Sequence, residues 1–238
     1  MAQNRSTAVM QRRHEAPDAL DDYPTPPWAT RALCEFLRET LALPIDAMTC
    51  REPAANRGYM FRTLAESFGY VEGFDVHDYG VGFPVADYLF PTPLDPVDWT
   101  VTNPPFRLAR QFLDRMAATS RVGYAVLVRS AFLEGQERFA DLFGPTPPAY
   151  ALQFVERCLM VRSRLIKEGA PDPFNLKDDG TPVKARTATA YCWLVWIHGN
   201  QDTRLRWLDN CRTRLERPGD YPDYAERWAE ISPKGGLL

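Results

Sequence analysis

Strand-like and helix-like segments alternate along the first half of the chain, and this alternation restricts the fold more than any other feature of the sequence. Short apolar runs suited to strands occur at Asp46–Arg51, Val71–Asp75, Val97–Thr102 and Val122–Arg129. Helical spacing of apolar residues occurs at Pro26–Leu43, Tyr59–Phe68 and Leu108–Ala118. Strands that alternate with helices form parallel sheets covered by helices. The sequence therefore predicts an α/β fold with a mostly parallel sheet, in which ligands bind beyond the carboxyl ends of the strands.

The pattern changes after Pro148. Ala149–Val161 and Thr187–Ile197 are rich in β-forming residues, which predicts a late antiparallel pair. Arg162–Arg186 lies between them, contains several Pro and Gly residues and has little periodicity, so we expect a long excursion from the sheet edge. Leu205–Leu215 is expected to form one more helix. The polar segment 1–22 is expected to be a flexible tail, which leaves 23–238 as a single domain with an insertion at 162–186.

Composition excludes several classes of protein. The chain has 238 residues, 45% of them hydrophobic, and a formal net charge of −3, so a nucleic-acid partner requires a local basic surface. The longest apolar run, near Ala190–Ile197, is too short to span a membrane, and the first 22 residues show no signal peptide. The five cysteines and three histidines lack the spacing of a metal site. We therefore expect a cytoplasmic protein with reduced thiols, no metal and no membrane partner.

Asn103-Pro104-Pro105-Phe106 follows the strand-like run Val97–Thr102 directly. Two consecutive prolines make a stiff loop, because each fixes φ and removes a backbone donor. An aromatic amine is a poor nucleophile, and two acceptors on its N–H bonds can hold it in position for an incoming methyl group. The Asn103 side-chain oxygen and the Pro104 carbonyl can supply these acceptors, while Phe106 can stack on the base. The same residues are also common in ordinary turns that end strands.

Small residues and an acidic residue mark a second candidate site. The turn Glu52–Gly58 lies between a strand-like and a helix-like segment, and small residues allow a ligand to approach the backbone. Asp75 ends the next strand, where an acidic residue commonly binds ribose hydroxyls. No G-x-G-x-x-G pattern is present, which disfavours a dinucleotide. Taken alone, Asp75 is better explained as a solvated acid at a strand end.

Five sequence elements in this order resemble the N6-adenine DNA methyltransferases, in particular the small ones carried by bacterial viruses and mobile elements. The elements are Tyr23-Pro24-Thr25-Pro26-Pro27, Glu52-Pro53-Ala54-Ala55-Asn56-Arg57-Gly58, Asp75, Asp87-Tyr88-Leu89 and Asn103-Pro104-Pro105-Phe106. The similarity covers Asp22 to Arg129 well and the remainder loosely. It implies a Rossmann-like methyltransferase sheet, S-adenosylmethionine as cofactor, DNA as partner and a bacterial host cytoplasm. Asn-Pro-Pro-Phe is specific for amine methyltransferases as a group and less specific for the substrate.

The resemblance also implies a role for each matching residue. It places the cofactor against Thr25, Pro26, Pro27, Glu52, Pro53, Ala54, Gly58, Asp75, Asp87, Tyr88 and Asn103. Among these, Thr25–Pro27 would flank the methionine end, Asp75 would hold the ribose and Asp87 the adenine amine. The target base would contact Asn103, Pro104, Pro105 and Phe106. The family usually has Gly at the position of Asn56, and Asn tolerates left-handed backbone better than most residues.

Basic residues are concentrated in the second half. The segment from Arg157 to Arg217 holds 12 Lys and Arg against 7 Asp and Glu. Within it, the candidate nucleic-acid contacts in the insertion are Arg162, Arg164, Lys167, Lys177, Lys184 and Arg186. These side chains could equally form ordinary solvated faces. A target adenine inside duplex DNA must be flipped out to be reached, and an insertion of this size favours short or relaxed sequence specificity.

Two other functions remain open from the sequence. The first is methylation of a different amine, such as guanine N2 in ribosomal RNA or a glutamine amide in protein, since those families also carry Asn-Pro-Pro-aromatic. The second is a catalytically inactive nucleic-acid-binding protein of the same fold, which the departure at Asn56 would favour. The early Tyr23–Pro27 element favours adenine as the substrate.

Overall fold

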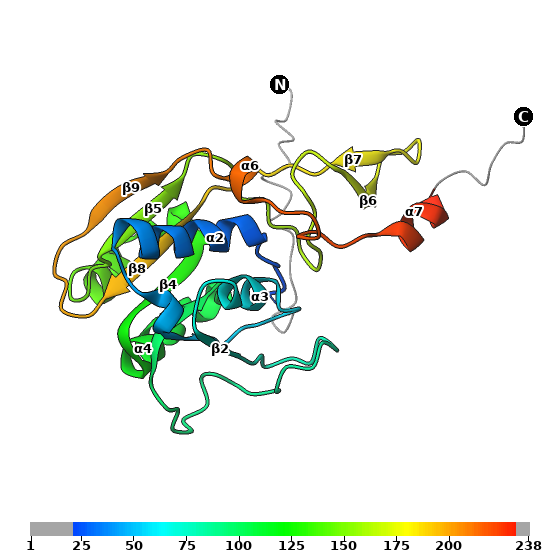
Figure 1. The fold of residues 1–238 in the computed structure, drawn as a ribbon. Helices are drawn as coiled ribbons and strands as arrows, with labels where there is room; N and C mark the ends of the chain where they lie inside the picture. Colours follow the sequence, from blue (N-terminus) through cyan, green and yellow to red (C-terminus); the bar gives the residue numbers. More distant parts are fainter. Residues whose placement is uncertain (1–20, 232–238) are drawn as a thin grey trace, which may run out of the picture.

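A seven-stranded sheet forms the centre of the molecule, of which the computed structural model describes residues 21–231 (Figure 1). The strand order is β2-β1-β3-β4-β8-β5-β9. The strands are β1 (Thr49–Glu52), β2 (Tyr70–Gly73), β3 (Val97–Thr102), β4 (Ser120–Arg129), β5 (Tyr150–Phe154), β8 (Tyr191–Ile197) and β9 (Arg204–Leu208). β1 to β4 pair in parallel, β8 runs antiparallel to both β4 and β5, and β9 is parallel to β5. The predicted α/β fold, mostly parallel with a late antiparallel pair, is confirmed.

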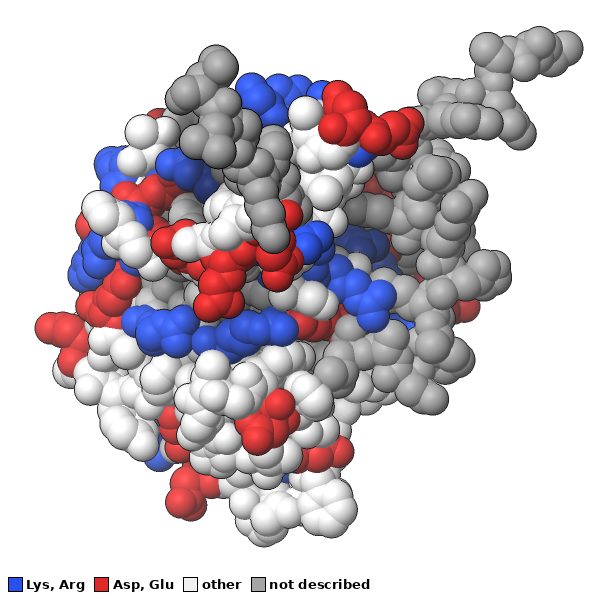
Figure 2. All heavy atoms as spheres, turned by 90° about the vertical axis from the view of Figure 1, so that its right-hand side faces the viewer, with Lys and Arg blue, Asp and Glu red and all other residues white. Residues whose placement is uncertain are grey.

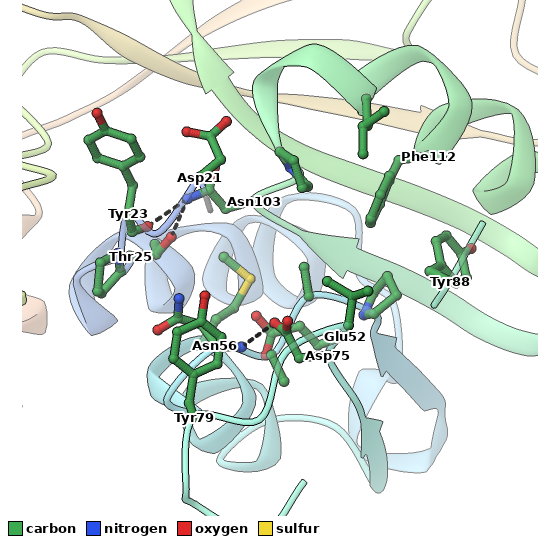
Figure 3. Close-up of a pocket in the computed structure, with 18 of the residues that line it drawn as sticks. Asp21, Tyr23, Thr25, Glu52, Asn56, Asp75, Tyr79, Tyr88, Asn103 and Phe112 are labelled. Carbon is green, nitrogen blue, oxygen red and sulfur yellow. Dashed lines mark hydrogen bonds between the residues drawn. The ribbon is translucent and has the colours of Figure 1, made fainter. Parts of the chain in front are cut away.

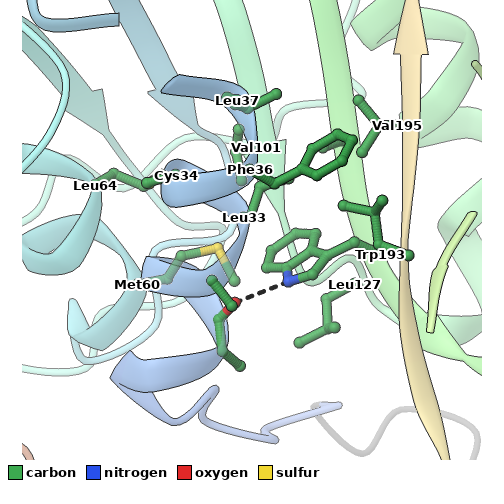
Figure 4. Close-up of a cluster of buried hydrophobic side chains, with 14 of the residues drawn as sticks. Leu33, Cys34, Phe36, Leu37, Met60, Leu64, Val101, Leu127, Trp193 and Val195 are labelled. Carbon is green, nitrogen blue, oxygen red and sulfur yellow. Dashed lines mark hydrogen bonds between the residues drawn. The ribbon is translucent and has the colours of Figure 1, made fainter. Parts of the chain in front are cut away.

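Helices cover both faces of the sheet and create two hydrophobic cores. The helices are α2 (Pro27–Glu35), α3 (Tyr59–Ala65), α4 (Ala109–Thr119), α5 (Gln136–Arg138), α6 (Arg212–Leu215) and α7 (Ala225–Ile231). Neighbouring strand residues point to opposite faces, so Leu127 packs in the core under α2 and α3 while Val126 packs in the core under α4. Figure 4 shows α2 lying on the first face, where the Trp193 indole donates to the Ala29 carbonyl at 2.9 Å.

The parallel strands bring their carboxyl ends to one edge of the sheet. β1 ends at Glu52, β2 ends just before Asp75, and β3 ends just before Asn103. Because β1 lies between β2 and β3, these three polar residues are neighbours at that edge. The cavity described below lies there, as expected for a parallel α/β sheet.

Several elements differ from the sequence-based expectation in extent. The helix expected at Pro26–Leu43 is α2 followed by a π-helical turn at Phe36–Thr40. A 3₁₀ turn at Ile45–Ala47 occupies the expected start of the first strand, so β1 begins only at Thr49. Of the β-rich stretch Ala149–Val161, only Tyr150–Phe154 is a strand.

The prediction of one helix over Leu205–Leu215 is wrong. Arg204–Leu208 form β9, and only Arg212–Leu215 are helical. The backbone of β9 pairs along the whole of β5, which would otherwise leave its outer edge without hydrogen bonds. That requirement comes from the assembled sheet and is not visible in the local spacing of leucines.

The insertion at 162–186 contains a separate two-stranded hairpin, β6 (Pro171–Leu176) and β7 (Pro182–Lys184). Figure 1 shows it near α7, and Phe174 in β6 packs edge-on against Tyr224 with ring centroids 5.2 Å apart. The expected excursion leaves after β5, which is not the sheet edge, because β9 lies outside it. The hairpin was not predicted, because the sequence of this segment has little periodicity.

Most of the expected tail, residues 1–20, lies outside the described residues. Its last two residues are packed on the domain: Asp22 is 6% exposed and accepts hydrogen bonds from Asn56 Nδ2 at 2.7 Å and Arg57 Nη1 at 2.8 Å. The backbone N–H of Ser163 donates to the Asp22 carbonyl at 2.8 Å, so this segment joins the insertion to the turn after β1.

The remaining sequence-wide expectations concern cysteines, metals and membranes. All five cysteines are free thiols buried in the protein. Across residues 21–231 no three His, Cys, Asp or Glu side chains are grouped closely enough to hold a metal ion. In the same range, no helix combines the length and apolar character needed to cross a membrane.

Candidate functional site

A cavity of about 390 Å³ lies at the carboxyl edge of β1, β2 and β3. The sequence-predicted residues that line it are Thr25, Glu52, Pro53, Ala54, Asp75, Asp87, Tyr88, Asn103 and Pro105. Those that lie outside its lining are Pro26, Pro27, Gly58, Pro104 and Phe106. Segments from five parts of the chain thus meet around one space, and Figure 3 shows their side chains turned toward it.

The Asn103 side chain is held in one orientation. Its Nδ2 donates to the Tyr23 carbonyl at 2.9 Å and to Thr25 Oγ1 at 3.2 Å (Figure 3), and approaches Met160 Sδ at 3.6 Å. Because both N–H groups of the amide are directed at these acceptors, the Oδ1 atom is left as an acceptor for a ligand. The segment before α2 therefore sets which end of the Asn103 amide serves the cavity.

The rest of the proline loop is fixed by a carboxylate. Pro104 is buried, and the backbone N–H of Phe106 donates to Asp21 Oδ2 at 2.6 Å. The Phe106 ring lies against Tyr23, with centroids 5.7 Å apart, and the Arg129 guanidinium lies 4.3 Å above it. Phe106 consequently stands beside the cavity, next to Pro105, which lines it.

Glu52 has an unsatisfied carboxylate at the floor of the cavity. The residue is 2% exposed, and its Oε2 has no hydrogen-bond partner among the described residues. Burial, reinforced by the negative charge of Asp75, raises the pKa of Glu52 well above its ordinary value. A buried carboxylate without a partner is costly, so this position suits a ligand that brings a positive charge or N–H donors.

Asp75 is oriented by two backbone donors. The N–H of Asn56 donates to Oδ2 at 2.8 Å, and the N–H of His77 donates to Oδ1 at 3.0 Å. Burial raises the pKa of Asp75 even though these hydrogen bonds oppose the shift. Each carboxylate oxygen retains a further lone pair, which can accept from a ligand hydroxyl.

The turn between β1 and α3 contains two residues with left-handed backbone. Asn56 has φ of 50° and Gly58 has φ of 78°. Asn56 compensates for its conformation through its side chain, which donates to Asp22 and accepts the N–H of Arg57 at 2.7 Å. A Cβ at Gly58 would lie 2.8 Å from the Phe83 ring. The turn thus keeps its shape although Asn stands at position 56.

An aromatic wall completes the cavity. Tyr88 is 2% exposed and packs on Phe112 from α4, with ring centroids 5.1 Å apart. Asp87 is exposed at the rim beside it. Tyr79, whose ring lies 4.9 Å below the Arg57 guanidinium, closes the opposite side. Such a wall suits a flat aromatic ring.

Sequence reasoning missed several lining residues. They are Asp21, Tyr59, Met60, Val76, Tyr79, Leu108 and Phe112, along with Tyr23, Pro24, Ala55, Asn56 and Leu89, which were noted in the matched elements without a binding role. The Asp-Asp-Tyr run at 21–23 was a usable signal, because it directly precedes the matched Pro24–Pro27 element. Phe112 carries no such signal, since it resembles any apolar residue of α4.

The charge of the lining limits what the cavity can bind. Four carboxylates line it, from Asp21, Glu52, Asp75 and Asp87, and the described lining includes no Lys or Arg. Phosphate-bearing cofactors need cationic or N–H donors and are disfavoured by this arrangement. A cationic small molecule with a flat ring and hydroxyls is favoured.

The six predicted nucleic-acid contacts lie in the insertion, away from the cavity lining. Arg164 pairs with Asp172 at 2.7 Å and Lys167 with Glu216 at 2.7 Å, so their charges are partly neutralised. Arg162, Lys177, Lys184 and Arg186 are exposed. Figure 2 shows acidic and basic side chains side by side on the face that forms the right-hand side of Figure 1. That face is therefore not uniformly basic.

Comparison with known proteins adds evidence on the fold. No protein-family model matches the chain, and no curated protein matches it by sequence. Solved structures of other proteins share its fold. One is a protein from Listeria monocytogenes described as a class I S-adenosylmethionine-dependent methyltransferase, with a TM-score of 0.54 and 13% identity over 94% of this chain and 74% of that one. The chain has the fold of class I methyltransferases.

Two further structures support this fold. A protein from Pyrococcus horikoshii described as an RNA methyltransferase has a TM-score of 0.52 and 15% identity, over 80% of this chain and 96% of that chain. A type I restriction-modification system methyltransferase subunit from Streptococcus thermophilus has a TM-score of 0.53 and 10% identity, over 88% of this chain and 52% of that chain. The fold therefore serves different substrates in different proteins.

Proposed function

We propose that this protein transfers a methyl group from S-adenosylmethionine to the N6 amine of adenine in DNA. The observation that carries the proposal is the orientation of Asn103, whose Oδ1 is left as an acceptor at the edge of a cavity lined by four carboxylates. The shared methyltransferase fold and the resemblance over Asp22–Arg129 support the same assignment.

The cavity suits S-adenosylmethionine in charge and shape. The unpartnered Glu52 carboxylate would face the positively charged methionine portion, and Asp75 would accept from the ribose hydroxyls. Tyr88, Phe112 and Asp87 would hold the adenine ring and its amine. When bound, the cofactor supplies an electrophilic methyl group on a sulfonium.

The residues of the proline loop would position the target amine. Asn103 Oδ1 and the Pro104 carbonyl would each accept one N–H of the exocyclic amine, and Phe106 would stack on the base. An amine held in this way would become cationic on accepting the methyl group that the cofactor supplies. Its acidic proton can then leave to water, so no general base is required of the protein.

The position of the site favours a flipped-out base. An adenine within a duplex cannot reach a cavity in the protein surface, so base flipping is part of the proposal. The β6–β7 hairpin in the 162–186 insertion is a small element to read base edges, and we expect short or relaxed sequence specificity.

The function can be tested by supplying labelled S-adenosylmethionine with DNA, RNA or protein, followed by nucleoside and amino-acid analysis. We expect N6-methyladenine from DNA. Methylguanine from RNA, or methylglutamine from protein, would keep the methyltransferase assignment and replace the substrate. Calorimetry without any substrate separates these outcomes from a protein that does not bind the cofactor.

A further inference from the structure

A second groove borders the proline loop. It has a volume of about 550 Å³. Its lining includes Phe106 and Arg107 from the 3₁₀ turn before α4, Arg110 from the first turn of α4, and residues of the 132–142 segment such as Phe132 and Arg138. We call it the arginine groove. The cavity at the sheet edge, lined by the carboxylates of Asp21, Glu52, Asp75 and Asp87, is called the carboxylate cavity. Along the loop, Pro105 and Leu108 line the carboxylate cavity, whereas Phe106, Arg107 and Ala109 line the arginine groove. A single short turn thus separates the two spaces.

Two of the arginines are held in place by neighbouring groups. Arg138 lies 4.3 Å above the Phe132 ring and donates to the Phe132 carbonyl at 2.9 Å. Arg110 pairs with Asp114 at 2.9 Å and donates to the Asp141 carbonyl at 2.6 Å. Guanidinium groups anchored on one side can still present their remaining N–H donors to a ligand.

Arg129 adds a cation where the groove meets the proposed base site. Its guanidinium lies 4.3 Å above the Phe106 ring, and the side chain is exposed at the end of β4. Within residues 21–231, no carboxylate pairs with Arg129. Three arginines and two carboxylates, Glu137 and Asp141, line the groove, and Asp114 pairs with Arg110, so the positive excess at the groove comes from Arg129.

We propose that the arginine groove binds the sugar–phosphate backbone of the substrate nucleic acid beside the flipped nucleotide. This proposal rests on the proposed function. Phosphates are repelled by the carboxylate cavity, so the strand must pass on the other side of the proline loop, and the groove lies there. Guanidinium groups match phosphate oxygens in geometry and charge, and phosphate contacts fix the register of the strand. Phe106 then belongs to both sites, as a stacking surface for the base and a wall for the backbone.

The test compares two double variants by fluorescence anisotropy with a short labelled DNA duplex containing adenines. Arg107→Gln/Arg129→Gln removes two charges at the groove, and the matched control Lys177→Gln/Lys184→Gln removes two exposed charges from the β6–β7 hairpin segment. We expect the groove variant to bind about tenfold or more weakly, with a salt slope about two units shallower, because each lost phosphate contact removes close to one unit. Affinity for S-adenosylmethionine, measured by calorimetry, should match the wild type.

An Arg107→Lys/Arg129→Lys variant, which keeps both charges, should recover most of the salt slope. A groove variant with the wild-type slope, or a hairpin variant that loses as much binding, would overturn the proposal. If the wild type methylates DNA and the groove variant does so equally well, only the groove assignment fails. If the wild type binds the cofactor but neither binds nor methylates nucleic acid, the proposed function fails with it.

Discussion

At the scale of single residues, the decisive contacts are those that orient Asn103. Its Nδ2 is tied to Tyr23 and Thr25, so the opposite atom is available to the amine. Asn103→Ala should reduce kcat by about 100-fold or more, as expected for loss of a preorganised acceptor, while S-adenosylmethionine binds with nearly unchanged affinity. Thr25→Val, which removes the hydroxyl that accepts one hydrogen bond from Asn103 Nδ2, should lower kcat by a smaller factor. Single-turnover kinetics and calorimetry check both, and full turnover by Asn103→Ala would remove this residue from the mechanism.

Glu52 is a second single residue with a large expected effect. Its buried carboxylate should lower the stability of the folded protein and strengthen the binding of the cofactor. Burial, and then the charge of Asp75, raise its pKa above the ordinary value of 4.5. The folded state therefore holds the Glu52 proton more tightly than the unfolded state does. As a result, the free energy of unfolding falls as pH rises from about the ordinary pKa through the raised one. Glu52→Gln does not titrate, so its Tm should exceed that of the wild type increasingly as pH rises, while cofactor affinity falls about tenfold or more. Melting curves from pH 5 to 9 test this, with exposed Glu39→Gln as control, and a difference that is constant with pH would contradict it.

At the scale of elements, two glycines with left-handed backbone allow backbone strain and steric contact to be measured separately. Gly58 lies in the turn between β1 and α3, and Gly80 lies in the loop after β2. Gly58→Ala places a Cβ 2.8 Å from the Phe83 ring at a φ of 78°. Gly80 has a φ of 72° with nothing within 4 Å of an added Cβ, so Gly80→Ala carries the backbone penalty alone. We expect Gly80→Ala to lower the free energy of unfolding by about 1 kcal/mol, and Gly58→Ala to cost about 1–3 kcal/mol more. Equal losses in denaturant titrations would show that Phe83 moves aside freely.

The same elements show how far sequence reasoning reaches. β3 and its Asn103–Phe106 loop were predicted at the correct residues, because an apolar run and two prolines specify them locally. The left-handed conformation tolerated at Asn56 was also readable from residue type. β9 and the lining residue Phe112 were not, since both depend on what the folded sheet places beside them. Local chemistry therefore predicted the strand ends, and tertiary contacts decided the outer sheet edge and the aromatic wall.

At the scale of the whole molecule, one buried arginine joins three distant parts of the chain. Arg31 in α2 is 7% exposed and donates to Glu66 after α3, to Asp220 near the carboxyl end and to the Leu215 carbonyl, each at 2.7–2.8 Å. Arg217 also reaches Glu66, at 2.8 Å. This network connects the helices that cover one face of the sheet to the segment that follows α6.

Arg31→Met should therefore destabilise the protein far more than the loss of an ordinary ion pair. The substitution leaves Asp220, whose side chain is 6% exposed, without its main partner, and an uncompensated buried charge costs about 3–5 kcal/mol. Arg38→Met is the matched control, because Arg38 and Glu39 are 50% and 60% exposed and such pairs contribute about 1 kcal/mol or less. Pairing Arg31→Met with Asp220→Asn should recover part of the loss, since the stranded charge is then gone. Denaturant titrations of the three variants decide the matter: if Arg31→Met costs no more than Arg38→Met, the segment after α6 is held by its apolar contacts and not by this network.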